Sequence, residues 1–232
     1  MILYHGTSEL MLRSILRTGL LPISMTAVEK TDRLAISQRH VYLTDCHAPY
    51  YAYRRCMFDG CARAAIIEVD LSGIERERLH FDARVLEEIG RDIDQLPETW
   101  AQMDRLRHYQ NLIDGGGVKH LMAKTGLNAM GSIAVAGAIP TTMIRRHAVA
   151  DLHVVVPDVF GASDPGISTF THKLRRNSNV ELTNKLFDST LEIEGVERYD
   201  FNRERGEHGN EGFGSQRPSN VYPNSCYQDD LG

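Results

Sequence analysis

The sequence lacks the features typical of secreted, membrane-spanning or nonspecific DNA-binding proteins. Only 4 of its 232 residues are cysteine, and no two of them have the C-x-x-C spacing of a redox or zinc motif, so no disulfide framework is expected. No apolar run approaches the roughly 20 residues that cross a bilayer. The formal net charge is −5, which argues against nonspecific duplex binding. The start MILYHGT has no basic segment and no long apolar segment, so we expect a cytoplasmic protein without a membrane partner.

The apolar content is sufficient for a sizeable core. Residues of the hydrophobic types make up 42 % of the chain, which suits one large domain. Short apolar segments alternate with polar ones, so both strands and helices are expected. The predicted strands are residues 2–5, 41–43, 64–71, 133–139, 143–146 and 152–156; the predicted helices are 8–18, 48–58 and, with a break near Pro97, 82–113.

The composition changes towards the C-terminus, which suggests a division of the chain. After Glu197 the only aliphatic residues are Val221 and Leu231. A segment this polar does not bury enough apolar surface to fold by itself. We expect a main domain at 1–157, a C-terminal extension of it at 158–199, and a polar, flexible tail at 200–232.

The segment His5-Gly6-Thr7 lies between the first predicted strand and the first predicted helix. Alone it is a weak signal, because a histidine at a strand end is more often structural than catalytic. Its context is more specific, with these segments in order: Ile15-Leu16-x-x-Gly19-Leu20, then Val41-Tyr42-Leu43-Thr44-Asp45, then a helix bearing alanines and tyrosines. This order resembles the ADP-ribosyltransferase superfamily, in its diphtheria-toxin-like and poly(ADP-ribose)-polymerase-like branch. The resemblance covers residues 2–71 well and extends loosely to residue 156.

The resemblance implies a fold and an activity. The fold would be α+β, a split β-sandwich of two mainly antiparallel sheets around an NAD-binding cleft, with flanking helices. The activity would be transfer of ADP-ribose from NAD⁺ to a macromolecule, protein or nucleic acid, with release of nicotinamide. Such a protein could serve as a toxin, a defence factor or an anti-defence factor, an expectation that comes from the family alone.

The same resemblance implies roles for five residues in binding NAD⁺. Gly6 lacks a Cβ, so the nicotinamide carboxamide could approach its backbone. His5 and Thr7 could hydrogen-bond ribose hydroxyls, although Thr7 could instead cap the following helix. Tyr42 would stack on the nicotinamide, and Tyr53 would cover its other face. For the tyrosines of residues 50–53, a packing face of the helix is the alternative.

A catalytic acid is missing where the resemblance implies one. A glutamate would stand just before the strand at 133–139, where its negative charge would stabilise the positive charge that develops on the ribose. This sequence has Gly131-Ser132 there. We expect Ser132 to occupy the glutamate's place, without its charge. An acid from elsewhere remains open, and Glu192 and Glu194 are the candidates from the C-terminal part.

Other functions and sites remain open alternatives. RNA 2′-phosphotransferases share the H-G-T and G-L signals, NAD⁺ hydrolysis needs no acceptor, and a non-catalytic binding module needs no acid. No metal is expected, because the spacing of the cysteines near His47 does not bring four ligands together. Glu68 and Asp70 are interpreted as outward-facing and strand-end residues. Arg145-Arg146 and the basic segment at 172–176 are interpreted as solvated, with phosphate binding as the alternative.

Overall fold

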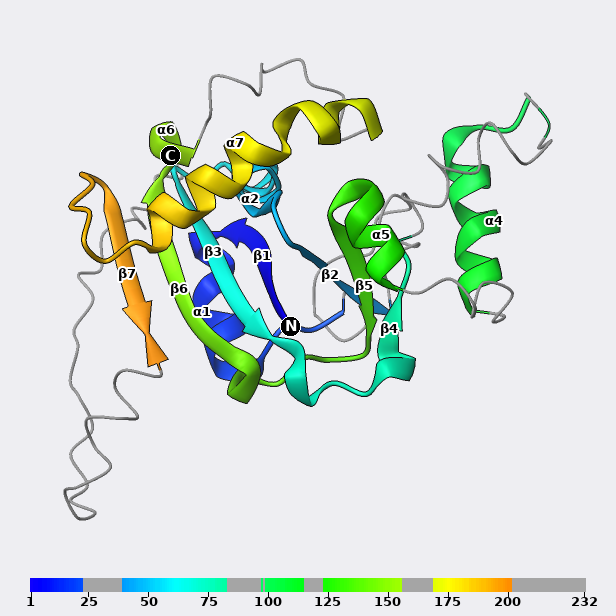
Figure 1. Cartoon of the computed structure of the whole chain (residues 1–232), viewed down its shortest axis with the longest axis horizontal. Coiled ribbons are helices and arrows are strands. Elements are labelled where there is room, and N and C mark those ends of the chain that lie inside the picture. Colours follow the sequence, from blue (N-terminus) through cyan, green and yellow to red (C-terminus); the bar gives the residue numbers. More distant parts are fainter. Residues whose placement is uncertain (23–38, 83–96, 98, 115–122, 156–168, 202–232) are drawn as a thin grey trace, which may run out of the picture.

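The computed structural model describes residues 1–22, 39–82, 97, 99–114, 123–155 and 169–201 (Figure 1). One seven-stranded sheet, in the order β4-β5-β2-β1-β3-β6-β7, forms its centre, and each neighbouring pair is antiparallel. The strands are β1 (Ile2–Ser8), β2 (His40–Thr44), β3 (Arg63–Asp70), β4 (Leu79–His80), β5 (Ser132–Ala136), β6 (Ile144–Asp151) and β7 (Val196–Asp200). The helices are α1 (Glu9–Thr18), α2 (Ala48–Asp59), α4 (Gln102–Asp114), α5 (Ala123–Met130), α6 (Leu152–Val155) and α7 (Thr169–Phe187), with 3₁₀ turns η3 (Leu71–Gly73), η4 (Arg76–Arg78) and η5 (Thr141–Met143).

Both faces of the sheet are buried, which explains the continuous apolar run of β3. Ala65, Ile67 and Val69 point into a core shared with α1. Ala64 and Ile66 point the other way, into a core shared with α2, α6 and α7. Successive strand residues face opposite sides of a sheet, so a strand covered on both faces is apolar throughout. In Figure 1, α7 crosses one face of the sheet and α1 lies behind the other.

The first helix begins and ends close to where the sequence predicts. Ser8 stands at the N-cap and Gly19 at the C-cap, where Gly19 has a φ of 82° and its N–H bonds the Ile15 carbonyl. A positive φ favours glycine. The Ser8 hydroxyl does not cap the helix; it donates to Asp59 Oδ2 of α2 at 2.5 Å. Ser8 therefore links β1 to α2.

The strands form one sheet, whereas two packed sheets were expected. The two halves, β4-β5-β2 and β1-β3-β6-β7, are joined where β1 pairs with β2 through Tyr4 and Thr44 alone. By contrast, β1 pairs with β3 over its whole length, from Ile2 to Ser8. Figure 1 shows β4 and β5 on one side of the molecule and β6 and β7 on the other. The mixed α+β class is confirmed, and the sheet is continuous but narrows to one residue pair near its middle.

Some predicted elements differ from the structure. The predicted strand at 152–156 is wrong, because Leu152–Val155 forms the short helix α6. The predicted strand at 143–146 extends much further, as β6 to Asp151. Much of the predicted helical region 82–113 lies outside the described residues, as does most of the predicted tail. Among the described residues, no helix is both long and apolar enough to span a membrane.

Candidate functional site

His5 lies where β1 and β2 part. Its Nδ1–H donates to the main-chain carbonyl of Tyr42 on β2, at 3.0 Å. Had the ladder continued from Tyr4 and Thr44, Gly6 would stand opposite Tyr42. The imidazole therefore engages the carbonyl that a continued ladder would have paired with β1. A carbonyl only accepts, so this bond places the proton on Nδ1 and leaves Nε2 as an acceptor when the ring is neutral.

The surroundings of His5 favour the neutral ring. Burial lowers its pKa below the ordinary value, the hydrogen bond to the Tyr42 carbonyl opposes that shift, and the charge of Arg55 adds to it. Desolvation disfavours the charged form of a histidine, and so does a nearby cation. A neutral ring with Nδ1 protonated can accept a hydrogen bond from a ligand hydroxyl at Nε2.

Gly6 is required by packing against α2. A Cβ at this position would lie 2.0 Å from the carbonyl oxygen of Ala48 and 2.7 Å from the nitrogen of Ala52. Helix α2 therefore rests directly on the β1 backbone. This contact explains the glycine by the approach of a helix, whereas the sequence suggested the approach of a ligand. The predicted contact of the Gly6 backbone with a carboxamide stays a prediction.

Thr7 and Tyr42 occupy different environments. Thr7 is buried and pairs with Ala65 of β3, so its predicted ribose contact also stays a prediction. Tyr42 is half-buried on β2, between the core residues Val41 and Leu43. By strand alternation its side chain points to the face opposite theirs. His5 shares the face of Leu3, so the two predicted site residues approach the parting of the strands from opposite faces.

Helix α2 places its tyrosines on different sides. Tyr51 and Arg55 are four residues apart, so they share one stripe of the helix. Helix α2 packs against the face of β1 that Gly6 presents, which by strand alternation is the face opposite to that of His5. Tyr53 is two residues from each, roughly half a turn away. The stacking role predicted for Tyr53 stays a prediction.

Ser132 begins β5 and holds a buried carboxyl group. Its Oγ donates to Asp82 Oδ2 at 2.8 Å, and the two residues are only 4 % and 5 % exposed. Ser132 pairs with Thr44 and Ala134 pairs with Tyr42. Ser132 and Tyr42 are thus diagonal neighbours on one face of the sheet, roughly 7–8 Å apart. The sequence has no carboxylate at the head of β5, but the fold brings one there from the end of β4.

Two further contacts hold α7 over the end of β2. Arg176 donates to both carboxylate oxygens of Asp45, at 2.9 and 2.5 Å. The Asn179 amide lies 2.7 Å from Nδ1 of His47, and both residues are fully buried. Arg176 was interpreted as a solvated residue, but it is engaged in an ion pair. These contacts link residues more than 130 positions apart, so no local signal in the sequence could have predicted them.

Glu68 is buried, contrary to its interpretation as an outward-facing residue. It is 2 % exposed, and its Oε2 accepts from Nε and an Nη of Arg146 at 2.9 and 2.7 Å. Arg145 lies 3.7 Å from its other oxygen. Arg146 also donates to the Phe187 carbonyl at the end of α7. The two arginines balance the negative charge of Glu68, which links β3 to β6, and Arg146 in turn links β6 to α7.

The other candidates for an acid lie far from the parting of β1 and β2. Glu192 and Glu194 are exposed in the turn before β7, which is the edge strand beyond β3 and β6. Within the described ranges no group of three or more histidine, cysteine, aspartate or glutamate side chains is arranged to hold a metal ion. Asp82 is the carboxyl group that the structure brings to Ser132, at the place where the sequence predicted the missing glutamate.

Comparisons with known proteins find distant structural likeness only. No family model and no curated protein matches the chain. Among solved structures, EcPltA aligns with a TM-score of 0.37 and 10 % identity over 74 % of this chain and 86 % of that chain. Nicked CARDS toxin aligns with a TM-score of 0.33 and 9 % identity over 65 % of this chain, which spans 25 % of that toxin's chain.

Proposed function

We propose that this chain binds NAD⁺ where β1 and β2 part and transfers its ADP-ribose to a macromolecule, releasing nicotinamide. The observation that carries the proposal is the hydrogen bond from His5 Nδ1 to the Tyr42 carbonyl. It joins the two motifs that resemble ADP-ribosyltransferases and fixes the imidazole as an acceptor at Nε2.

The groups at this place suit a dinucleotide. His5 Nε2 would accept a hydrogen bond from a ribose hydroxyl. The half-buried Tyr42 would offer its ring to the nicotinamide, with Tyr53 of α2 as the second aromatic side chain; offset stacking contributes about 0.5–1.5 kcal/mol beyond burial. Because the two strands separate here, one ligand could contact side chains that belong to opposite faces of the sheet.

Asp82 would supply the negative charge that the reaction requires. When the bond from ribose C1′ to the nicotinamide nitrogen breaks, its electron pair leaves with nicotinamide and positive charge develops on the sugar. A carboxylate oriented by Ser132 would stabilise that charge. An acceptor nucleophile then bonds to C1′ and loses its proton to solvent or a base. This assigns the charge to Asp82 and an orienting role to Ser132.

One experiment tests the transfer and identifies the acceptor class. The protein would be incubated with NAD⁺ labelled at the adenylate phosphate and with a whole-cell lysate, and the products digested separately with protease and nuclease. We expect label on macromolecules that one digestion removes and the other leaves. Release of nicotinamide without labelled macromolecules would indicate NAD⁺ hydrolysis. If neither nicotinamide release nor labelled macromolecules are detected, a non-catalytic binding module is the remaining alternative.

A further inference from the structure

Two thiols meet at the end of α2, on the side of the molecule where β3 begins. Helix α2 ends at Asp59, and Gly60 follows in the left-handed conformation, with φ 65° and ψ 30°. The Cys61 N–H then bonds back to the Cys56 carbonyl at 3.0 Å. This closing turn is a common helix terminus, and it folds Cys61 back over Cys56.

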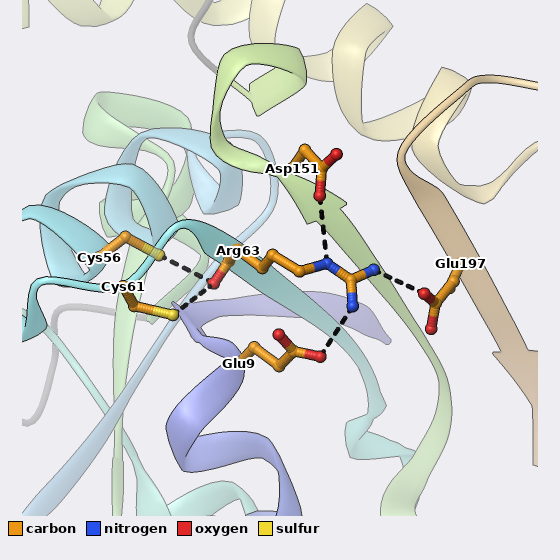
Figure 2. Close-up of polar contacts among 6 residues, drawn as sticks. All are labelled: Glu9, Cys56, Cys61, Arg63, Asp151 and Glu197. Carbon is orange, nitrogen blue, oxygen red and sulfur yellow. Dashed lines mark hydrogen bonds and ion pairs between the residues drawn. The ribbon is translucent and has the colours of Figure 1, made fainter. Parts of the chain in front are cut away.

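Both sulfurs use the same acceptor. Cys56 Sγ lies 3.2 Å and Cys61 Sγ 3.1 Å from the carbonyl oxygen of Arg63, and Figure 2 shows the two side chains converging on that oxygen. Because both sulfurs lie within 3.2 Å of the same oxygen, they are near each other. Burial, and then the neighbouring Cys61, raise the pKa of Cys56 to about 12.

The acceptor residue is itself held rigidly. The Arg63 guanidinium contacts Glu9 of α1 at 3.0 Å, Asp151 of β6 at 3.2 Å and Glu197 of β7 at 2.8 Å (Figure 2). These ion pairs fix the start of β3, and with it the carbonyl that gathers the thiols. The arrangement of the two sulfurs therefore depends on the fold and is not a property of the short turn alone.

We propose that Cys56 and Cys61 form a redox modification site, in which a thiol oxidant converts the two thiols into one disulfide across the end of α2. Cys61 is partly exposed and Cys56 is fully buried, so Cys61 reacts first and Cys56 completes the bond. With diamide, the Cys61 sulfur adds to the N=N bond; the Cys56 sulfur then attacks Cys61 and displaces the hydrazine. Both thiols lose their hydrogens to the reagent, which is reduced.

The sequence offers a direct readout. Trypsin cleaves after Arg55 and Arg63, so both cysteines fall in one peptide, CMFDGCAR. The native protein would be treated with diamide, which spares Met57, then freed of the reagent, unfolded in the presence of iodoacetamide so that every remaining thiol is alkylated, and digested. Without diamide we expect this peptide to carry two alkyl groups. After diamide we expect it to carry none and to have the mass of the unmodified peptide less two hydrogens. Cys46, buried elsewhere at the end of β2, remains alkylated and serves as the internal control.

Two variants keep the test decisive. In Cys61→Ser, Cys56 should remain alkylated after diamide, whereas Cys46→Ser should leave the disulfide unchanged. The proposal is overturned if both cysteines of the native peptide stay alkylated, or if Cys61 is recovered bonded to another cysteine.

Discussion

His5 is the residue on which the proposed site depends most. Its ring replaces a main-chain pairing between β1 and β2, and its bond to the Tyr42 carbonyl sets which nitrogen is free to accept. If the His5 side chain both completes the sheet and contacts a ligand, its removal has two separable effects. One effect would be on folding stability and the other on NAD⁺ affinity.

We expect His5→Ala to weaken NAD⁺ binding roughly 5- to 150-fold, which corresponds to the loss of one buried hydrogen bond, about 1–3 kcal/mol. Isothermal titration calorimetry on the folded variant measures it. His153→Ala, at an exposed histidine of α6, is the matched control and should bind like the unchanged protein. Equal affinity in a folded His5→Ala protein would remove the proposed site from this place.

Asp82→Asn should slow nicotinamide release by about 10²–10³ while leaving NAD⁺ affinity nearly unchanged, because it removes charge that acts in the transition state. The amide keeps the size of the side chain, and its oxygen can still accept from Ser132. Initial rates of nicotinamide release, compared with calorimetric affinities, separate the two effects. A rate unchanged by this substitution would show that the acid lies elsewhere.

Single residues were predicted from sequence only where their partners are local. The His5 and Tyr42 motifs stand out because each lies in a recognisable strand. The roles of Asp82 and Glu68 could not be read in that way, because the partner of each is 50 or more positions away. A lone carboxyl residue in a sequence does not indicate whether the fold will bury it, pair it or expose it.

At the scale of elements, the contact between β1 and α2 is the tightest in the region of the site. We expect Gly6→Ala to destabilise the protein by about 1–3 kcal/mol or more, because its methyl group would meet the α2 backbone. Urea unfolding measures the loss. At Gly73 the nearest atom to an added Cβ is the flexible end of Met143, at 3.4 Å, so Gly73→Ala should cost far less. Similar losses for the two variants would contradict the packing role.

The pairing of β6 with β7 should depend on pH. His147 stacks on Tyr199 at 5.4 Å, and burial lowers its pKa below the ordinary value of about 6.5. A lowered folded-state pKa means that the unfolded chain binds the proton more readily, so this contribution is present above pH 6.5 and is lost as the pH falls. We expect the free energy of unfolding to decrease from pH 8 to pH 5. His147→Phe should flatten that decrease, while His153→Ala should not.

Elements with clear periodicity or a clear terminator were predicted well. The Gly19 terminator, the strand around Tyr42 and the apolar run of β3 all occur where expected. The segment Leu152–Val155 was mistaken for a strand because a short apolar run has no period of its own. Two-residue β4 and the polar strand β7 carry no such signal, and their place is set by the strands they pair with.

At the scale of the whole molecule, β7 is the last strand in the part of the chain that the structure describes. Residues up to Asp200 belong to the sheet, and Phe201 lies against His147. We expect a chain ending after Phe201 to fold and to bind NAD⁺ as the full chain does, because the remaining sequence is poor in aliphatic residues. Thermal unfolding and calorimetry check this. Loss of folding on truncation would show that the last residues complete the domain.

The fold class of the molecule was predictable from the sequence, whereas the continuity of its sheet was not. Mixed helices and antiparallel strands follow from the sequence pattern. Whether β1 and β2 join one sheet or face each other in two depends on a single pair, Tyr4 with Thr44. No sequence pattern specifies a junction that narrow. Because β1 and β2 pair only at this position, the two strands are already apart at His5, where the ligand is proposed to bind.

Nitrogen-detected NMR of the His5 ring, with and without NAD⁺, tests the central claim most directly. The spectrum distinguishes the two neutral tautomers, and His5→Ala assigns the signal. The account predicts that His5 is neutral at pH 7 with the proton on Nδ1, and that saturating NAD⁺ shifts the Nε2 resonance while Nδ1 remains protonated. A proton on Nε2 in the free protein, or an Nε2 resonance that NAD⁺ leaves unchanged, would contradict it.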